Sequence, residues 1–432
     1  MAAVRILWVK ANKLLPVQSG GDIRSYHIAK QLARKHQLTF FSYYDGEADS
    51  EYERALQREF PESVCFSTGK RTHGFLQRGL DYAMQAVGDA PYAISRFSSS
   101  EVRARLQKYY ESGCFDAVVC DFLDAAVNFP SELTTPTLLF QHNVESEIWR
   151  RHAETESNPG KRMLYRVEFA KMSRYEARIV REFHHVIAVS DHDSKLMQRW
   201  VDGSRIKVVP TGVDLEQFAS SGPEVITDPL VMFVGAMDWE PNIDAVEFFC
   251  DQIWPVVQAK VPGARFRIVG RNPDRRVLRR ASASVEVTGS VPSVVEHLRE
   301  AATVVVPLRI GGGTRLKIYE AMAAGKVVIS TSIGAEGLEV RDGHDIVLAD
   351  EPASFAESVI TFLTDAGERR RLGMAAAATA SRCARRIGYP GSSTFPWPRF
   401  REFSRFLRCF RAGGNQNANC SICRAKAATC WC

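Results

Sequence analysis

The most informative stretch of the sequence is Pro307-Leu-Arg-Ile-Gly-Gly-Gly-Thr-Arg-Leu-Lys-Ile-Tyr-Glu-Ala-Met-Ala-Ala-Gly-Lys326. It lies between two short apolar runs, residues 303–306 and 327–330, which are typical of buried strands. The stretch itself begins with glycines and continues with a helical pattern, so the expected order is strand, loop, helix, strand. This order indicates an open sheet of parallel strands covered by helices.

Three glycines, Gly311, Gly312 and Gly313, form the predicted loop, and Thr314 is placed to cap the helix that follows. Glycines let the backbone approach a ligand closely, and a helix start offers free N–H groups at the positive end of the helix dipole. The loop therefore favours an anionic ligand such as a diphosphate.

Three charged residues follow the loop. Arg315 and Lys317 add positive charge where a diphosphate would bind. Glu320 lies about six residues into the predicted helix, close enough to offer its carboxylate to vicinal ribose hydroxyls. An alternative interpretation is an ion pair between Glu320 and Lys317 on a solvated helix face.

Similar apolar runs recur along the whole chain, separated by helical patterns, and they fall into two series. The first comprises residues 4–9, 38–43, 117–120, 137–140 and 186–189, and the second comprises residues 230–234, 266–269, 285–288, 303–306 and 327–330. The two series predict an α/β protein with two doubly wound domains, residues 1–215 and 216–380, divided near residues 210–214 and 220–228. Ligands of such sheets bind at the carboxyl ends of the strands, so we expect a cleft between the domains that draws on both.

The net charge is distributed unevenly. Over all 432 residues it is +6, but residues 381–432 alone carry +9, which leaves residues 1–380 at −3 and gives no argument for nucleic acid binding. Residues 381–432 are also rich in cysteine and lack any regular period. They are compatible with a zinc ligand set, a basic appendage or out-of-frame sequence, and their composition favours the last, an aberrant disordered tail.

Hydropathy predicts a cytoplasmic location, because we find no charged-then-apolar leader and no uncharged stretch near the ~20 residues that a spanning helix needs. Residues 161–185 alternate basic and apolar side chains and could rest on the inner face of an anionic membrane as a peripheral contact. Glu168, Glu176 and Glu182 dilute that charge, which favours a solvated helix packed on the sheet.

Several motifs, taken in order, resemble the family-4 retaining glycosyltransferases (glycosyl transferase group 1, GT-B fold). Within that family they resemble the GGGTRLK subgroup of exopolysaccharide-associated sugar transferases. In the second half the motifs are Phe233-Val-Gly235, Ile268-Val-Gly-Arg271, Val287-Thr-Gly289, the glycine loop and Glu320-Ala-Met-Ala-Ala-Gly325. In the first half, residues 19–26 resemble the family's amino-terminal glycine loop and residues 208–214 its inter-domain signature. The similarity extends from about Val4 to about Ala380.

The resemblance implies two Rossmann-like domains that face a cleft. A sugar would move from a nucleoside diphosphate sugar to the hydroxyl of a saccharide or lipid-linked acceptor, with retention and without a metal or other cofactor. The product would be a surface polysaccharide or glycolipid. Ribose binding is carried over to Glu320, further donor contacts to Gly235 and Arg271, and stabilisation of the departing diphosphate to Arg315 and Lys317.

Two departures from the family pattern bear on function. Gly312 stands where relatives have a first glutamate, so that residue's sugar contact is not carried over. Ala236 and Asn242 stand where many relatives have Arg and Lys, and Arg315 and Lys317 would compensate. Gly312 motivates a second hypothesis, a non-catalytic nucleotide-sugar-binding protein, and a third is a nucleotide-sugar 2-epimerase-like enzyme of the same fold.

In the first half, His142 follows the run at residues 137–140, where a parallel strand should end. A lone histidine is more often structural, but this one resembles the family's cleft histidine, which would bind the transferred sugar; Glu145 would orient it or cap the next helix. Gly20 and Gly21 either admit a phosphate to their N–H groups or form a simple turn. About eleven residues separate them from the first strand, which disfavours the tight nicotinamide-binding turn.

Overall fold

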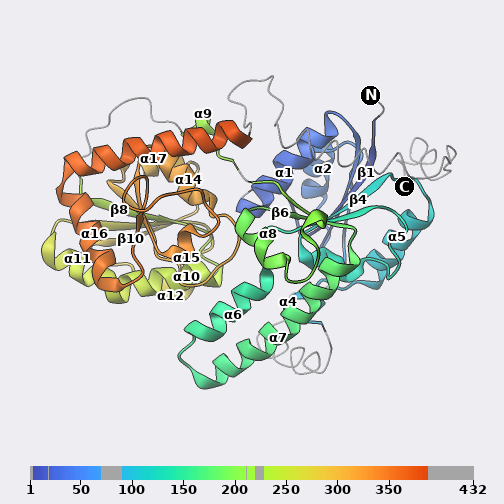
Figure 1. Cartoon of the computed structure of the whole chain (residues 1–432), viewed down its shortest axis with the longest axis horizontal. Helices are drawn as coiled ribbons and strands as arrows, with labels where there is room; N and C mark the ends of the chain where they lie inside the picture. The colour runs from blue at the N-terminus through green and yellow to red at the C-terminus, as the bar shows by residue number, and fades with distance from the viewer. Residues whose placement is uncertain (1–2, 18, 70–89, 211, 219–227, 388–432) are drawn as a thin grey trace. The chain divides into compact units, whose positions relative to one another are not determined.

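The structure, a computed structural model, describes residues 3–17, 19–69, 90–210, 212–218 and 228–387 (Figure 1). These residues form two compact units, one made by the residues up to Ala153 and by Asn158–Val209, the other chiefly by those from Pro210 onward. Each unit is built on a parallel sheet with helices, so the predicted α/β class with two doubly wound domains is confirmed. Among the described residues, no helix is long and apolar enough to cross a membrane.

Within the described residues, the sheet of the first unit has seven parallel strands in the order β3-β2-β1-β4-β5-β6-β7. The strands are β1 Arg5–Ala11, β2 Gln37–Tyr44, β3 Val64–Ser67, β4 Ala117–Asp121, β5 Thr137–Phe140, β6 His185–Ala188 and β7 Ile206–Val208. The strand order reverses between β1 and β4. At such a switch point the loops leave the sheet in opposite directions and open a ligand crevice.

Several helices of the first unit begin at polar caps that satisfy their first N–H groups. Ser19, for example, accepts from the Asp22 N–H at 3.1 Å, and Asn158 accepts from Gly160 and Lys161. The helices are α1 Gly20–Ala33, α2 Ser50–Glu59, α4 Tyr92–Ser95, α5 Ser100–Glu111, α6 Glu145–Thr155, α7 Pro159–Glu182 and α8 Asp191–Met197, with 3-10 turns at Leu123–Asn128 (η1) and Gly203–Arg205 (η2).

The sheet of the second unit repeats this plan, with six parallel strands among the described residues in the order β10-β9-β8-β11-β12-β13. Its strands are β8 Leu230–Val234, β9 Arg265–Val269, β10 Val285–Gly289, β11 Thr303–Val306, β12 Val327–Ser330 and β13 Val347–Leu348. Here the order reverses between β8 and β11. The glycine-rich stretch leaves β11 at this point, as predicted from its position between two strands.

Helices pack on the faces of the second sheet. They are α9 Leu215–Phe218, α10 Glu240–Phe248, a π turn at Phe249–Ile253 (η3), α11 Trp254–Lys260, α12 Arg275–Leu278, α13 Val294–Glu300, α14 Leu316–Ala323, α15 Ser332–Ala335, α16 Pro352–Thr364 and α17 Ala366–Ile387. The last described helix, α17, continues past Ala380, the predicted start of the tail, and it buries Cys383 and Ala384. The rest of the predicted tail, residues 388–432, lies outside the described residues.

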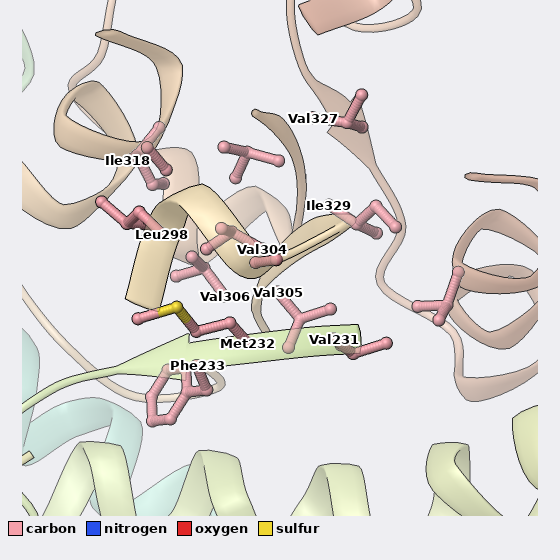
Figure 2. Close-up of a cluster of buried hydrophobic side chains, with 14 of the residues drawn as sticks. Val231, Met232, Phe233, Leu298, Val304, Val305, Val306, Ile318, Val327 and Ile329 are labelled. Atoms are coloured by element: carbon pink, nitrogen blue, oxygen red, sulfur yellow. The ribbon is translucent and has the colours of Figure 1, made fainter. Parts of the chain in front are cut away.

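The core of the second unit explains why its central strands are apolar at every position. All residues of β11 and β12 are buried, because helices cover both faces of a parallel sheet. Figure 2 shows the centre of this core, where side chains of β8, β11 and β12 meet Leu298 of α13 and Ile318 of α14. This packing fixes the carboxyl ends of β8 and of β11, and the glycine loop follows β11.

A close backbone crossing in the second unit gives a stability test. A Cβ added to Gly270 would overlap the carbonyl oxygen of Gly235, so Gly270→Ala should lower the free energy of unfolding by about 3 kcal/mol, the upper end for overpacking. Gly263→Ala is the matched control, since a Cβ there meets nothing within 4 Å. Thermal denaturation of both variants checks this, and equal melting temperatures would contradict the crossing.

Candidate functional site

The glycine loop of the second unit takes backbone conformations that require glycine. Gly311 has a φ of 148° and Gly313 a φ of 68°, values that other residues rarely adopt. The helix that follows, α14, begins at Leu316 and has Arg315 at its N-cap position without a side-chain cap. The prediction that Thr314 caps this helix is therefore wrong, because the loop continues one residue further than the sequence pattern indicated.

Arg315 lies inside this loop and not in bulk solvent. Its side chain is only 5% exposed, and it donates to the carbonyl oxygens of Gly313 and, at 3.1 Å, Ile333. A Cβ on Gly311 would come within 2.8 Å of the guanidinium. The absence of a side chain at Gly311 therefore permits both the turn and the position of the Arg315 guanidinium. Through its bond to Ile333, Arg315 connects the loop to α15.

Lys317 lies next to Arg315 and has a different partner. Its Nζ donates to Asn242 Oδ1 at 2.9 Å and lies 4.4 Å from the centre of the Phe233 ring. Asn242 is buried, and its Nδ2 donates to the Ala236 carbonyl at 2.9 Å. Asn242 thereby links α14 to the loop that follows β8. Sequence reasoning noted Asn242 only as a replacement for a basic residue and missed this role.

Lys317 and Glu320 are partly buried on the same helix, and burial shifts both away from their ordinary titration ranges. Burial and the neighbouring charge of Arg315 lower the pKa of Lys317 to about 7, although Glu320 opposes the shift. Burial raises the pKa of Glu320 to about 7, against the effect of Lys317. Each group can therefore gain or lose charge near neutral pH when a charged ligand approaches.

The remaining predicted residues of this unit lie on neighbouring strand ends. Gly235 follows β8, where a Cβ would come within 2.6 Å of Asn242 Nδ2, and Arg271 follows the adjacent strand β9. The Arg271 carbonyl accepts from Met237 N–H at 2.9 Å, which joins the two strand ends. The structure thus gathers the glycine loop, Thr314, Arg315 and Lys317 around the ends of β8 and β11, with Arg271 one strand further along. Glu320 follows Lys317 by about one turn of α14.

In the first unit, a buried carboxylate occupies the switch point between β1 and β4. Asp121 is fully buried and accepts from Trp8 Nε1 at 3.0 Å, Ser25 Oγ at 3.0 Å and His142 Nε2 at 2.8 Å, with Lys10 Nζ at 3.6 Å. Burial alone would raise the pKa of Asp121, but Lys10 and His142 hold it at about 2. Sequence reasoning missed Lys10 and Asp121, although both lie at the carboxyl ends of central strands.

His142 is a neutral member of this cluster. Burial lowers its pKa to about 4 even though Asp121 acts in the opposite direction. Because Asp121 is ionised, Nε2 carries the proton and donates to it, and Nδ1 accepts from Arg24 at 2.9 Å. Both ring nitrogens are therefore bonded within the first unit, and the side chain is nearly inaccessible.

Phe122 covers the histidine. Its ring stacks on His142 at 3.7 Å between centroids and 12° between planes, and Lys10 Nζ lies 4.3 Å from its centre. Phe122 has a φ of 70°, an unusual value for a bulky residue that indicates strain at a site where function is often found. The two glycines of the amino-terminal motif, Gly20 and Gly21, are the first residues of α1, and a Cβ on Gly21 would overlap the Phe122 ring.

Glu145 neither orients His142 nor caps α6, so both interpretations of it are wrong. It is the first residue of α6, and the cap is supplied by Glu176 of α7, whose Oε1 accepts from Glu145 N–H and whose Oε2 accepts from Ser146 N–H, both at 2.9 Å. Burial, with Asp124 and Glu176 nearby, raises the pKa of Glu145 to about 8. A cap from a distant helix leaves no local sequence signal.

Family models match both units of the chain. Residues 19–217 match the model of glycosyltransferase family 4, and residues 228–365 match that of glycosyl transferases group 1. A phosphatidyl-myo-inositol mannosyltransferase of Mycobacterium tuberculosis is 30% identical over 213 residues, which cover 45% of this chain and 55% of that protein. An uncharacterized 44.6 kDa protein in the cps region of Klebsiella pneumoniae is 25% identical over 31% of this chain and 36% of its own length. These alignments thus span about a third to a half of the curated relatives.

Solved structures of similar fold cover nearly the whole chain. Anabaena HepE in complex with UDP and glucose superposes with a TM-score of 0.59 at 14% identity, over 88% of this chain and 95% of that one. Sucrose-phosphate synthase from Thermosynechococcus elongatus gives a TM-score of 0.64 at 15% identity, over 95% and 100%. At such identities the likeness shows the fold, which is GT-B.

The lowered pKa of His142 predicts a pH-dependent loss of stability. The unfolded chain binds this proton near pH 6.5 and the folded chain only near 4, so the free energy of unfolding should fall by up to about 3 kcal/mol as the pH drops between them. His142→Gln removes this contribution, and denaturant titrations from pH 7 to 4 compare it with the parent chain. His344→Gln, at an exposed position, is the control for loss of a histidine. A parent chain and His142→Gln variant with parallel pH profiles would contradict the assignment.

Proposed function

We propose that the chain is a group 1 glycosyltransferase that transfers a sugar from a nucleoside diphosphate sugar to an acceptor hydroxyl with retention at the anomeric carbon and without a metal. The observation that carries this proposal is that Arg315 is bonded within the glycine loop that follows β11, while Lys317 is held near the end of β8 and Glu320 follows on the same helix. Such a switch point is where open α/β sheets bind nucleotides.

The diphosphate would lie against the glycine loop. Gly311, Gly312 and Gly313 leave room for a ligand to approach the backbone closely. The guanidinium of Arg315 donates to the Gly313 carbonyl of the same loop. Lys317 gains a full charge when an anion approaches, because its pKa lies near 7 in the free chain. Leaving-group departure is the demanding step, and one preorganised donor contributes roughly 2.7–4 kcal/mol to stabilising such developing charge.

Glu320 would accept hydrogen bonds from the ribose hydroxyls of the donor, and Gly235 and Arg271 would line the donor side from the neighbouring strand ends. A carboxylate with a pKa near 7 is partly protonated in the free chain, and two hydroxyl donors favour its charged form. Thr314, between the glycines and Arg315, completes this set of donor-side residues.

His142 would contact the transferred sugar from the first unit. Since Nδ1 is bonded to Arg24 and the ring lies under Phe122, such a contact requires Phe122 to move or Arg24 to release the ring. Gly20 and Gly21 are the first residues of α1, and Gly21 lies against the Phe122 ring. Their N–H groups would bind the same ligand. Because its pKa is lowered to about 4, His142 would be neutral near pH 7 and would interact with the sugar through hydrogen bonds, without a positive charge.

The named relatives support a sugar substrate. Anabaena HepE was solved with UDP and glucose, and the Mycobacterium tuberculosis relative is a phosphatidyl-myo-inositol mannosyltransferase. By analogy the donor here is a nucleoside diphosphate hexose, and the acceptor is a saccharide or a lipid-linked glycan used for surface polysaccharide or glycolipid. The chain would then work in the cytoplasm, at the inner face of the membrane.

A labelled-donor assay tests the proposal. Incubation with UDP-, GDP- and ADP-hexoses should release nucleoside diphosphate only when a saccharide acceptor is present, and NMR of the product should show the donor's anomeric configuration. Isomerised nucleotide sugar without acceptor would instead identify an epimerase. Saturable binding with no turnover would identify a nucleotide-sugar-binding protein that lacks catalysis.

Substitution of Glu320 tests the ribose contact separately. Glu320→Ala should weaken binding of the nucleoside diphosphate about tenfold or more, because hydrogen bonds to a charged group contribute about 1.5–3 kcal/mol. Isothermal titration calorimetry measures this, with the exposed Glu357→Ala as the control for loss of a carboxylate on the same unit. An unchanged dissociation constant for Glu320→Ala would remove Glu320 from the site.

A further inference from the structure

Helix α7 exposes an apolar patch at its amino-terminal half. Met163 is 61% exposed, Leu164 39% and Val167 38%, and their spacing of three and four residues places them on one side of the helix. Tyr165, from the other side, contacts Trp149 and His152 of α6, with ring centroids 6.0 and 5.1 Å apart. Figure 1 shows α6 and α7 reaching away from the sheet of the first unit.

Basic side chains surround and extend this patch. Lys161, Arg166, Arg174, Arg178 and Arg181 are all exposed on α7. Residues 163, 167, 174 and 178 are spaced by four, seven and four, so the apolar and basic side chains form one continuous stripe. We call this stripe the α7 face, defined by Met163, Leu164, Arg166, Val167, Arg174 and Arg178.

The acidic residues of α7 do not neutralise this face. Glu168 is 2% exposed and accepts from Tyr92 N–H at 3.1 Å, and Glu176 is fully buried as the cap of α6. Within α7, which the structure describes in full, the exposed acid is Glu182 at the last position, 3.8 Å from Arg178. Two of the three glutamates that the sequence analysis set against the basic charge therefore lie off the exposed face of the helix.

We propose that the α7 face binds an anionic lipid surface. The apolar side chains would enter the boundary between headgroups and acyl chains, and the arginines would contact lipid phosphates, as interfacial basic helices do. Charge complementarity favours this partner, because the face carries three exposed arginines and the one exposed acid of α7, Glu182, pairs only with Arg178. A second copy of the chain, placed symmetrically on the same face, would bring arginine against arginine.

Vesicle binding by the full chain tests this inference without using catalysis. The chain should sediment with vesicles of phosphatidylglycerol and phosphatidylcholine, remain in solution with phosphatidylcholine alone, and dissociate as salt is raised. The triple variant Arg166→Gln/Arg174→Gln/Arg178→Gln should bind anionic vesicles on the order of 100-fold more weakly, roughly fivefold per arginine. Met163→Ser/Val167→Ser should also weaken binding, and its residual binding should be abolished by salt.

The matched control is Arg54→Gln/Arg58→Gln/Arg105→Gln, which removes three exposed arginines of the same unit from other helices. This control should bind vesicles as the parent chain does. Equal loss in the control, full binding by the α7 triple variant, or equal affinity for duplex DNA and for anionic vesicles would overturn the inference. Transfer to a water-soluble acceptor without vesicles should be unchanged in the α7 triple variant, so failure of lipid binding and failure of the proposed sugar transfer are distinguishable.

Discussion

One buried carboxylate organises the first unit around its switch point. Asp121 receives hydrogen bonds from β1, from α1 and from the segment after β5, and its charge is balanced by Lys10. An ionised group in the interior is tolerated only with such partners, since desolvation of a charge otherwise costs several kcal/mol. The tautomer of His142, the position of Arg24 and the stacking of Phe122 all follow from how Asp121 is satisfied.

The second unit has a switch point of the same geometry, but different side chains occupy it. Both sheets reverse their strand order at the first and fourth strands, yet no buried acid corresponds to Asp121 among the described residues at the ends of β8 and β11. Glycines, the amide of Asn242 and two cations occupy that place. A cationic end of one sheet and a carboxylate-centred end of the other are suited to ligands of different charge.

The sequence predicted the central strands well and the edges poorly. Ten apolar runs correspond to strands, and several, such as Leu230–Val234 and Val327–Ser330, coincide with their observed bounds. The strands that were missed are β3, β7 and β13, all at or next to an exposed sheet edge and only two to four residues long. Short edge strands bury few side chains, so they leave little periodicity to detect.

The candidate site divides in the same way. The glycine loop and the basic side chains after it are consecutive in the sequence. The residues proposed to bind the donor could therefore be recognised from the sequence alone. The partners Asn242 for Lys317, Arg24 for His142 and Glu176 for α6 are separated from their targets by 31 to 118 positions. Whether the side chain of a distant partner faces its target depends on how the helices pack, which the sequence pattern does not reveal. Glu168, which is buried on α7, is another example.

The contacts of Arg315 have a kinetic consequence. A guanidinium already bonded to Gly313 and Ile333 would exchange carbonyl partners for the oxygens of the proposed anion, so the net gain would be the difference between two similar sets of bonds. The loop is ordered before any ligand arrives, which spares conformational entropy on association. When the proposed anion leaves, the same carbonyls would accept from the arginine again. This arrangement favours rapid exchange at the loop over long residence.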